Sequence, residues 1–209
     1  YDSEGVKHDT NYVYDDYGRL TNKITPQGTI TNVYGTNSVT VTTPEGSSTK
    51  TFDTAGLVTE IEDDGGIISY TYNNRALVSQ INYDGKNIIF DYDKAGNKIK
   101  INDPNKGVDS MAYNPLGELT YYLDANGSEY TMQYDNYGRL ISRTCGSETT
   151  VWNYNSGTGL LESVVGNETS VNYMYDDNKL YITKQIEVID GQNFETSFTY
   201  DEYGNVSTV

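Results

Sequence analysis

Two stretches of the chain, "YVYDDYGRLTNKI" (Tyr12–Ile24) and "MQYDNYGRLISRT" (Met132–Thr144), are nearly the same phrase. Each has an aromatic residue followed by Asp, two variable residues, and then Gly-Arg-Leu at the same interval. Self-similarity of this kind is the sequence signature of a repeat architecture. We therefore test the whole chain for further copies.

Further copies occur along the entire 209-residue chain at intervals of 18 to 25 residues. The aromatic residue of each copy serves as its anchor, and the next residue is Asp or Asn at every anchor except Tyr34. The ten anchors are Tyr14, Tyr34, Phe52, Tyr72, Tyr92, Tyr113, Tyr134, Tyr154, Tyr175 and Tyr200. Six copies carry Gly four positions after the anchor: Gly18, Gly56, Gly96, Gly117, Gly138 and Gly204. We expect one continuous array over residues 1–209.

Each repeat predicts two strands and two turns. In Asp-x-x-Gly the Asp side chain can accept a backbone N–H two residues on, and Gly can adopt a positive φ. Apolar and polar residues alternate before each anchor, which is typical of a strand with one buried face. A second turn with Pro, Asp-Gly or Asn-Gly precedes the next anchor, as in Pro44-Glu45-Gly46, Asp84-Gly85 and Asp190-Gly191.

The expected fold is therefore all-β: tandem antiparallel hairpins of about 20 residues that form a curled or spiralling sheet. No segment keeps helical spacing, and we expect no helix longer than two turns. We expect the anchors to be buried and to stack from repeat to repeat. Three tyrosines inside the turns, Tyr17, Tyr137 and Tyr203, should be exposed, and they are the candidate binding aromatics.

The charge restricts the partners. Acidic residues outnumber basic ones 30 to 14, which gives a net charge of −16. Nucleic-acid affinity depends on Lys and Arg that neutralise phosphates, and we expect neither nucleic acid nor anionic lipid as a partner. The longest apolar runs are only a few residues, which predicts no membrane insertion. Both ends fall within or just after a repeat, which suggests a fragment of a longer protein.

Candidate chemical groups are sparse. His8 is the only His, lies in a polar stretch, and has no recognisable orienting partner for nucleophilic catalysis. Cys145 is the only Cys, which excludes an intrachain disulfide. Paired acids such as Asp15-Asp16 are explained by turn chemistry, and none lies in a twelve-residue calcium-loop pattern. We expect no catalytic residue, no metal site and no cofactor.

The phrases "YDDYGRL" (14–20) and "YDNYGRL" (134–140) resemble the RHS or YD-repeat family, and "FDTAGLV", "YDKAGNK", "YNPLGEL" and "YDEYGNV" resemble it in part. The resemblance covers essentially the whole chain. It implies a strip of hairpins that winds into a partial shell, as in bacterial polymorphic toxins, insecticidal toxin complexes, wall-associated proteins and teneurins. In the toxins the shell encloses a variable C-terminal toxin that an aspartyl autoprotease site releases. No motif matching that site is found here.

Two hypotheses about function remain open. The first is a non-catalytic scaffold or shell segment of a large secreted or cell-surface protein, for which the family resemblance implies a bacterial origin. Its partners would be the rest of the same polypeptide and an enclosed toxin domain absent from this chain. The second is an adhesion module that binds glycans or a cell-surface protein through the exposed turn tyrosines.

Overall fold

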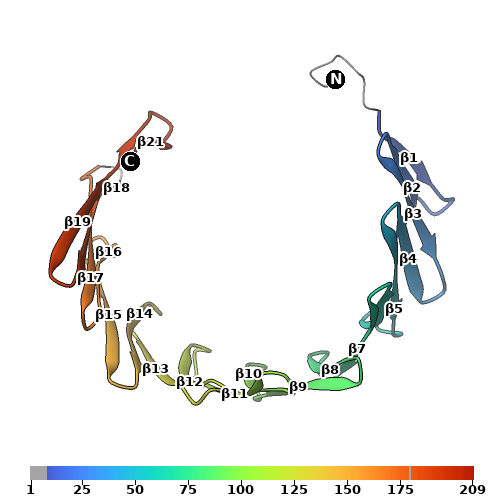
Figure 1. Ribbon diagram of the computed structural model, residues 1–209, viewed down its shortest axis with the longest axis horizontal. Coiled ribbons are helices and arrows are strands. Elements are labelled where there is room, and N and C mark those ends of the chain that lie inside the picture. The colour runs from blue at the N-terminus through green and yellow to red at the C-terminus, as the bar shows by residue number, and fades with distance from the viewer. Residues whose placement is uncertain (1–8, 179) are drawn as a thin grey trace. The chain divides into compact units, whose positions relative to one another are not determined.

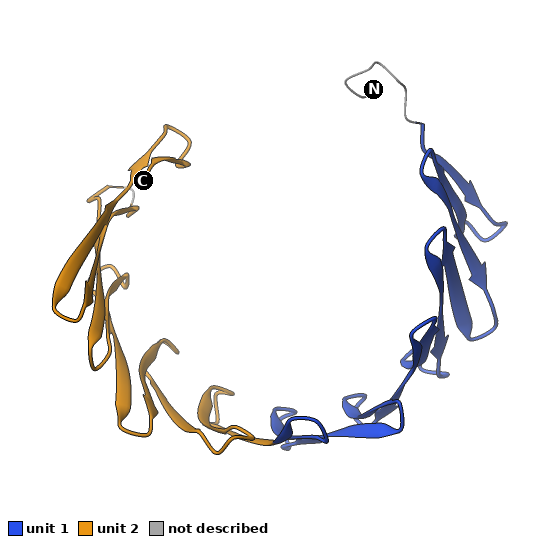
Figure 2. Ribbon diagram, in the orientation of Figure 1, with its two compact units in different colours: residues 1–107 blue, residues 108–209 orange. Residues whose placement is uncertain are grey.

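The computed structural model describes residues 9–178 and 180–209, and their regular secondary structure consists of β-strands alone. The all-β prediction is confirmed, and no helix occurs among these residues. None of them could therefore cross a membrane as an apolar helix. His8 lies outside the described residues. The chain divides into two compact units, Tyr1–Gly107 and Val108–Val209 (Figure 2). The prediction of a single continuous array stays a prediction.

Unit 1 is an antiparallel meander in which each strand pairs with the next along the chain (Figure 1). Its strands are β1 (Asn11–Tyr14), β2 (Leu20–Thr25), β3 (Gly28–Tyr34), β4 (Ser38–Thr43), β5 (Gly46–Phe52), β6 (Val58–Asp63), β7 (Gly66–Tyr72), β8 (Val78–Tyr83), β9 (Lys86–Tyr92) and β10 (Lys98–Asp103).

Unit 2 repeats the same arrangement from β11 to β19 and adds a separate pair, β20 with β21. Its strands are β11 (Gly107–Tyr113), β12 (Leu119–Leu123), β13 (Glu129–Tyr134), β14 (Leu140–Cys145), β15 (Glu148–Tyr154), β16 (Leu161–Val165), β17 (Thr169–Tyr175), β18 (Ile182–Ile189), β19 (Gln192–Ser197), β20 (Thr199–Tyr200) and β21 (Val206–Thr208).

Every anchor is the last residue of its strand, and a turn follows it, which carries Gly four positions after the anchor in six copies. At most anchors the register shifts by one residue, as between Val13 and Tyr14, which marks a bulge at the turn. The six turn glycines have φ between 77° and 97°, the left-handed region that glycine adopts without a steric penalty. The second turn of each repeat closes a tight hairpin, as at Asp84-Gly85, where both residues have positive φ.

The two faces of each meander differ in chemistry. One face carries the anchor and the residue two before it, as with Phe90 and Tyr92 in β9. The opposite face carries small polar residues that bond across strands, as between the hydroxyls of Thr40 and Thr49 at 2.9 Å. This alternation is the period-two pattern of the sequence expressed in space.

The anchors are less buried than the sequence predicts. They are half-buried, apart from Tyr14, which is 58% exposed, and no apolar residue among those described is fully buried. The chain exposes 14260 Å², whereas a compact globule of this mass exposes about 9,700 Å². A single layer of strands explains the difference, because among residues 9–178 and 180–209 each repeat packs only on its neighbours and no further layer covers the aromatic face.

Candidate functional site

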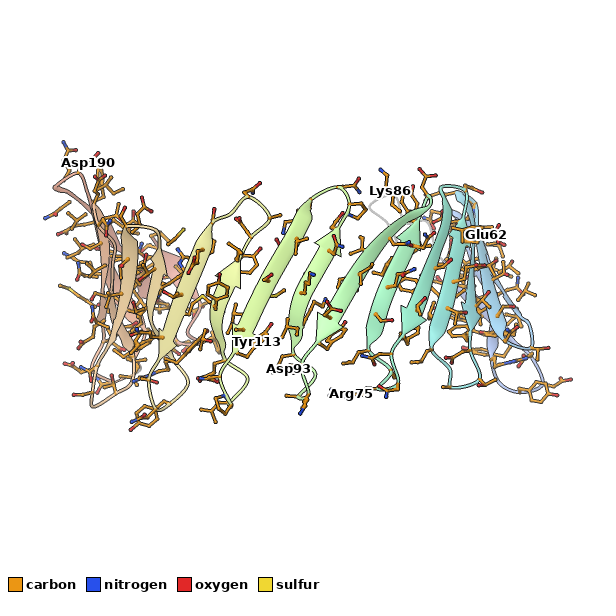
Figure 3. All side chains as sticks on the ribbon, turned by 90° about the horizontal axis from the view of Figure 1, so that it is seen from below. Glu62, Arg75, Lys86, Asp93, Tyr113 and Asp190 are labelled. Atoms are coloured by element: carbon orange, nitrogen blue, oxygen red, sulfur yellow. The ribbon has the colours of Figure 1, made fainter. Side chains whose placement is uncertain are left out.

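The turns after the anchors gather along one edge of each meander, which we call the anchor-turn edge. In unit 1, Arg75 and Asp93 lie at this edge, while Glu62 and Lys86 lie at the opposite one (Figure 3). Asp15 shows how such a turn is held: its Oδ1 accepts the backbone N–H groups of Tyr17 at 3.0 Å and Arg19 at 2.9 Å. Its carbonyl also accepts the N–H of Gly18 at 2.9 Å.

The same side-chain capping recurs along the chain. In most anchor turns the first side chain accepts backbone N–H groups further along the turn, and Asn serves as well as Asp. Examples are Asp53, Asn73, Asp93, Asn114, Asp135, Asn155 and Asp201, and Asp124 does the same in a second turn. The turns are therefore rigid, and they hold whatever residue stands at their tips in a fixed place.

Three turn tips carry tyrosines that project into solvent. The exposed fractions of Tyr17, Tyr137 and Tyr203 are 85%, 85% and 81%. Exposed aromatic rings held on rigid turns can contact a partner at little cost in conformational entropy. Their role in binding stays a prediction.

The anchor hydroxyls join each repeat to the one before it. Tyr92 donates its hydroxyl to the carbonyl of Val78 at 2.7 Å, and Tyr154 donates to Leu140 at 3.1 Å. In both pairs the acceptor begins the second strand of the preceding repeat. Equivalent bonds are made by Tyr34, Tyr72, Tyr134, Tyr175 and Tyr200. This hydrogen bond explains why the anchor is Tyr in nine of the ten copies.

Arginines make a second link between neighbouring turns. Arg139 donates from Nε and Nη2 to Asp135 Oδ2 at 2.7 and 2.6 Å, and from Nη1 to the carbonyl of Gly159 at 3.0 Å. Its guanidinium carbon also lies 5.1 Å from the centre of the Tyr137 ring and 4.3 Å from that of Tyr154. Arg139 thus packs against two aromatic rings and holds two successive turns together.

Arg19 makes the same stack with Tyr17 and Tyr34, at 5.1 and 4.4 Å. Arg75 instead donates to the carbonyls of Asp93 and Lys94 in the following turn. Sequence reasoning assigned these arginines no role, although the repeated Gly-Arg-Leu was a signal that could have pointed to one.

These contacts change the ionisation of the turn aspartates. Partial burial raises the pKa of Asp135, but hydrogen bonds from the Arg139 side chain and backbone outweigh it and hold the pKa below its ordinary value of 3.8. The pKa of Asp15 is lowered in the same way, with partial burial outweighed by the hydrogen bonds from Arg19. The pKa of Asp93 is lowered chiefly by the Asn97 amide, and burial raises the pKa of the Tyr92 phenol. At neutral pH Asp15, Asp93 and Asp135 are thus anionic acceptors.

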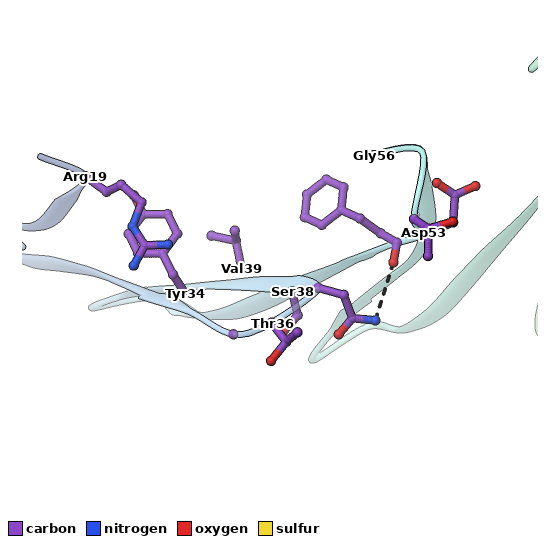
Figure 4. A pocket seen from close by; sticks show the side chains of 11 residues that line it. Arg19, Tyr34, Thr36, Ser38, Val39, Asp53 and Gly56 are labelled. Atoms are coloured by element: carbon purple, nitrogen blue, oxygen red, sulfur yellow. Dashed lines mark hydrogen bonds between the residues drawn. The ribbon is translucent and has the colours of Figure 1, made fainter. Parts of the chain in front are cut away.

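Two grooves open at the anchor-turn edge, one in each unit. The first has a volume of about 730 Å³ and is lined by Arg19, Tyr34 and the turn that follows Tyr34. There the Arg19 guanidinium lies against the Tyr34 ring, and the Asn37 amide donates to the carbonyl of Phe52 (Figure 4). The second, of about 680 Å³, is lined by residues 135–137, 139 and 154–159. Each groove includes a turn that departs from the Asp-x-x-Gly pattern. This is the turn after Tyr34 in the first groove and the turn after Tyr154 in the second.

Other chemical groups do not form a site. Among the described residues, no group of three His, Cys, Asp or Glu side chains is placed to hold a metal ion. Cys145 is half-buried at the end of β14, and its thiol beside Tyr130 raises the pKa of that phenol. Asp109 is 4% exposed, and its carboxylate accepts the backbone N–H of Ala125. Sequence reasoning missed Asp109. It lies four positions before its anchor, where the other copies carry an apolar or hydroxyl-bearing residue, and an acid at this position was a usable signal.

Known proteins share the repeat and the fold. Residues 113–150 match the family model of the RHS repeat. No curated protein matches the chain. The Photorhabdus luminescens Tc holotoxin pore with a mutated TccC3 has a similar fold, with a TM-score of 0.80 and 15% identity over 95% of this chain and 13% of that chain.

A crystal structure of TcdB2–TccC3–TEV matches with a TM-score of 0.73 and 17% identity over 94% of this chain and 12% of that chain. A crystal structure of TcdB2–TccC3–Cdc42 matches with a TM-score of 0.57 and 13% identity over 95% of this chain and 15% of that chain. Identities this low compare the folds alone. This chain spans only 12–15% of the length of these three matches.

Proposed function

We propose that this chain, an array of RHS/YD repeats, is a non-catalytic wall segment of a larger protein shell. The resemblance to RHS/YD repeats is confirmed by the family model over residues 113–150 and by the similar fold of the Tc toxin chains. The match to a Tc toxin pore chain over 95% of the present chain is the observation that carries the proposal.

The internal geometry supports a scaffold. Most repeats are joined to the preceding one by a strand ladder and, at the anchor-turn edge, by the anchor hydroxyl bond, as from Tyr92 to Val78. These links recur at intervals of about one repeat, and none of them requires a ligand. A wall built in this way resists local opening, because separating two repeats breaks several bonds at once.

We further propose that the full protein is a secreted or cell-surface protein of bacterial origin. In this proposal the wall encloses or presents a C-terminal toxin domain that is absent from this chain. The rest of the same polypeptide is then the principal partner. The net charge of −16 supports this assignment, because it disfavours nucleic acid as the partner of the wall.

Protease protection tests the proposal. An antibody raised against this chain would identify the native polypeptide and its mass in cells and culture medium. That polypeptide would then be digested briefly, intact and after deletion of residues 9–209. We expect a C-terminal segment to be protected only in the intact form. Equal digestion of that segment in both forms would contradict an enclosing wall.

A second candidate function is adhesion, in which the chain binds glycans or a cell-surface protein. The observation that favours it is the 81–85% exposure of Tyr17, Tyr137 and Tyr203 at rigid turn tips. A glycan array and a cell-binding assay with Tyr17→Ala and Tyr137→Ala variants test it. Absence of binding by all forms would remove this candidate and leave the wall segment unaffected.

A further inference from the structure

We propose that the groove beside Tyr137 binds a neutral oligosaccharide, and that Tyr137 alone among the three turn tyrosines is its aromatic platform. We call it the Tyr137 groove; it is lined by residues 135–137, 139 and 154–159. The proposal goes beyond the scaffold function and rests on the second candidate, adhesion, which it narrows to one site and one ligand class.

The lining of the Tyr137 groove suits a sugar. Its volume of about 680 Å³ falls within the range of roughly 300–1,000 Å³ that small-ligand sites occupy. The Tyr137 ring is 85% exposed and offers a face on which the C–H side of a pyranose can pack, because aromatic faces carry partial negative charge. Asn136 and Ser156 line the groove, are exposed, and make no hydrogen bond to another described residue. Their amide and hydroxyl groups can bond to sugar hydroxyls in either direction.

The charge of the groove selects a neutral ligand. The only cation in its lining is Arg139, and the Asp135 carboxylate, 2.6 Å from Nη2, compensates that charge. The remaining guanidinium bond goes to the Gly159 carbonyl. A sulfated or uronate-rich chain would therefore find no uncompensated cation here, and it would be repelled by a protein of net charge −16.

The other two turn tyrosines are natural controls. Tyr17 has the same exposure and the same arginine stack, but it is not part of the lining of the neighbouring groove, which is formed by Arg19 and Tyr34. Tyr203 is 81% exposed, and its turn has Asn205 at the position of the arginine. Exposure and ring chemistry are thus matched. Tyr17 differs from Tyr137 in its place outside the groove, and the turn of Tyr203 also lacks the arginine.

Titration calorimetry with the whole chain tests the proposal. The probes are maltohexaose, cellohexaose, chitohexaose and mannohexaose, with a heparin hexasaccharide as the anionic comparison. We expect at least one neutral probe to bind and Tyr137→Ala to weaken it at least about tenfold, which is the loss of about 1.4 kcal/mol expected for one stacking contact. Tyr17→Ala and Tyr203→Ala should each change the affinity less than about twofold.

Three results would overturn the proposal: no binding of any neutral probe, tighter binding of the heparin hexasaccharide, or an equal loss in Tyr203→Ala and Tyr137→Ala. A thermal melt of each variant excludes misfolding as the cause, since these exposed rings contribute little to stability. If no sugar binds, adhesion to a cell-surface protein is still a candidate, because the cell-binding assay tests it separately. Protease protection reports on the wall segment independently of both.

Discussion

At the scale of single residues, the anchors act through two parts of one side chain. The ring of Tyr92 covers part of the aromatic face, and its hydroxyl bonds to the preceding repeat at Val78. Phe52 keeps the ring and lacks the hydroxyl, which shows that the fold tolerates an occasional missing bond. The two parts can therefore be separated by mutation.

We predict that Tyr92→Phe lowers the free energy of unfolding by about 1 kcal/mol, the usual value of one lost hydrogen bond. Tyr92→Ala should cost roughly 2–3 kcal/mol, less than the 3–5 kcal/mol of a fully buried aromatic, because this ring is only half-buried. Urea denaturation measures both. Tyr137→Phe and Tyr137→Ala are the controls, with expected changes of less than about 0.5 kcal/mol. Equal losses at Tyr92 and Tyr137 would mean that the anchor makes no special contribution.

A second prediction at this scale concerns pH. The pKa of Asp93 in the folded chain is lowered by hydrogen bonds from Asn97 and from backbone N–H groups. A lowered folded-state pKa gives stability that is present above the ordinary value of 3.8 and is lost as pH falls through the folded value. Asp93→Asn, which imitates the natural Asn73 and Asn114, should be less stable than wild type at pH 7, and this difference should shrink below pH 4.

Thermal melts from pH 7 to pH 3 measure the difference. Asp16→Asn is the matched control, because it removes the same charge at a side chain that bonds to no other described residue. A wild-type advantage over Asp93→Asn that stays constant down to pH 3 would show that ionisation of Asp93 does not matter.

At the scale of elements, the turns determine where each strand ends. Most anchor turns place a residue of positive φ four positions after the anchor, and this residue is Gly18 in the first copy and Ala76 in the fourth. Ala at this position is strained, because its Cβ crowds the neighbouring carbonyl in the left-handed region. Gly18 and Ala76 therefore occupy equivalent positions, and exchanging Gly and Ala can be tested in both directions.

We predict that Gly18→Ala destabilises the chain by about 1 kcal/mol and that Ala76→Gly stabilises it by up to about 1 kcal/mol. Gly18 is the suitable site because an added Cβ there would meet no atom within 4 Å, which isolates the backbone effect. Equilibrium denaturation in urea gives both values. A stabilising Gly18→Ala would indicate that chain entropy outweighs strain at these turns.

At the scale of the whole molecule, each unit is a single layer of strands with one aromatic and one polar face. The large exposed area follows from this construction, since every strand is covered only by its neighbours along the sheet. Stability then accumulates repeat by repeat, and an outer strand is held from one side only. In β1, which pairs with β2, all four residues are exposed.

We predict that the chain is monomeric at low salt and self-associates as salt rises. An exposed strand edge can pair with another chain, and repulsion between molecules of net charge −16 is screened beyond about 10 Å at 0.1 M salt. Light scattering from 50 mM to 1 M salt would measure this effect, with Tyr12→Lys as the variant that should stay monomeric. Monomers of the parent chain throughout the series would mean that the strands near Tyr12 and Tyr200 are not available for pairing.

The sequence by itself determined the repeat, the strands and the turns, because these depend on neighbouring residues: Asp caps its own turn, Gly adopts positive φ, and alternation assigns each side chain to a face. It also identified the anchors and the exposed turn tyrosines. The tertiary structure decided the contacts between repeats, namely the bond from Tyr92 to Val78, the stack of Arg139 on two rings, the burial of Asp109, and the groove beside Tyr137. Apart from the stack of Arg139 on Tyr137 within one turn, these contacts join residues that are 14 or more positions apart. Their distances depend on how adjacent repeats lie against each other, which no local pattern records.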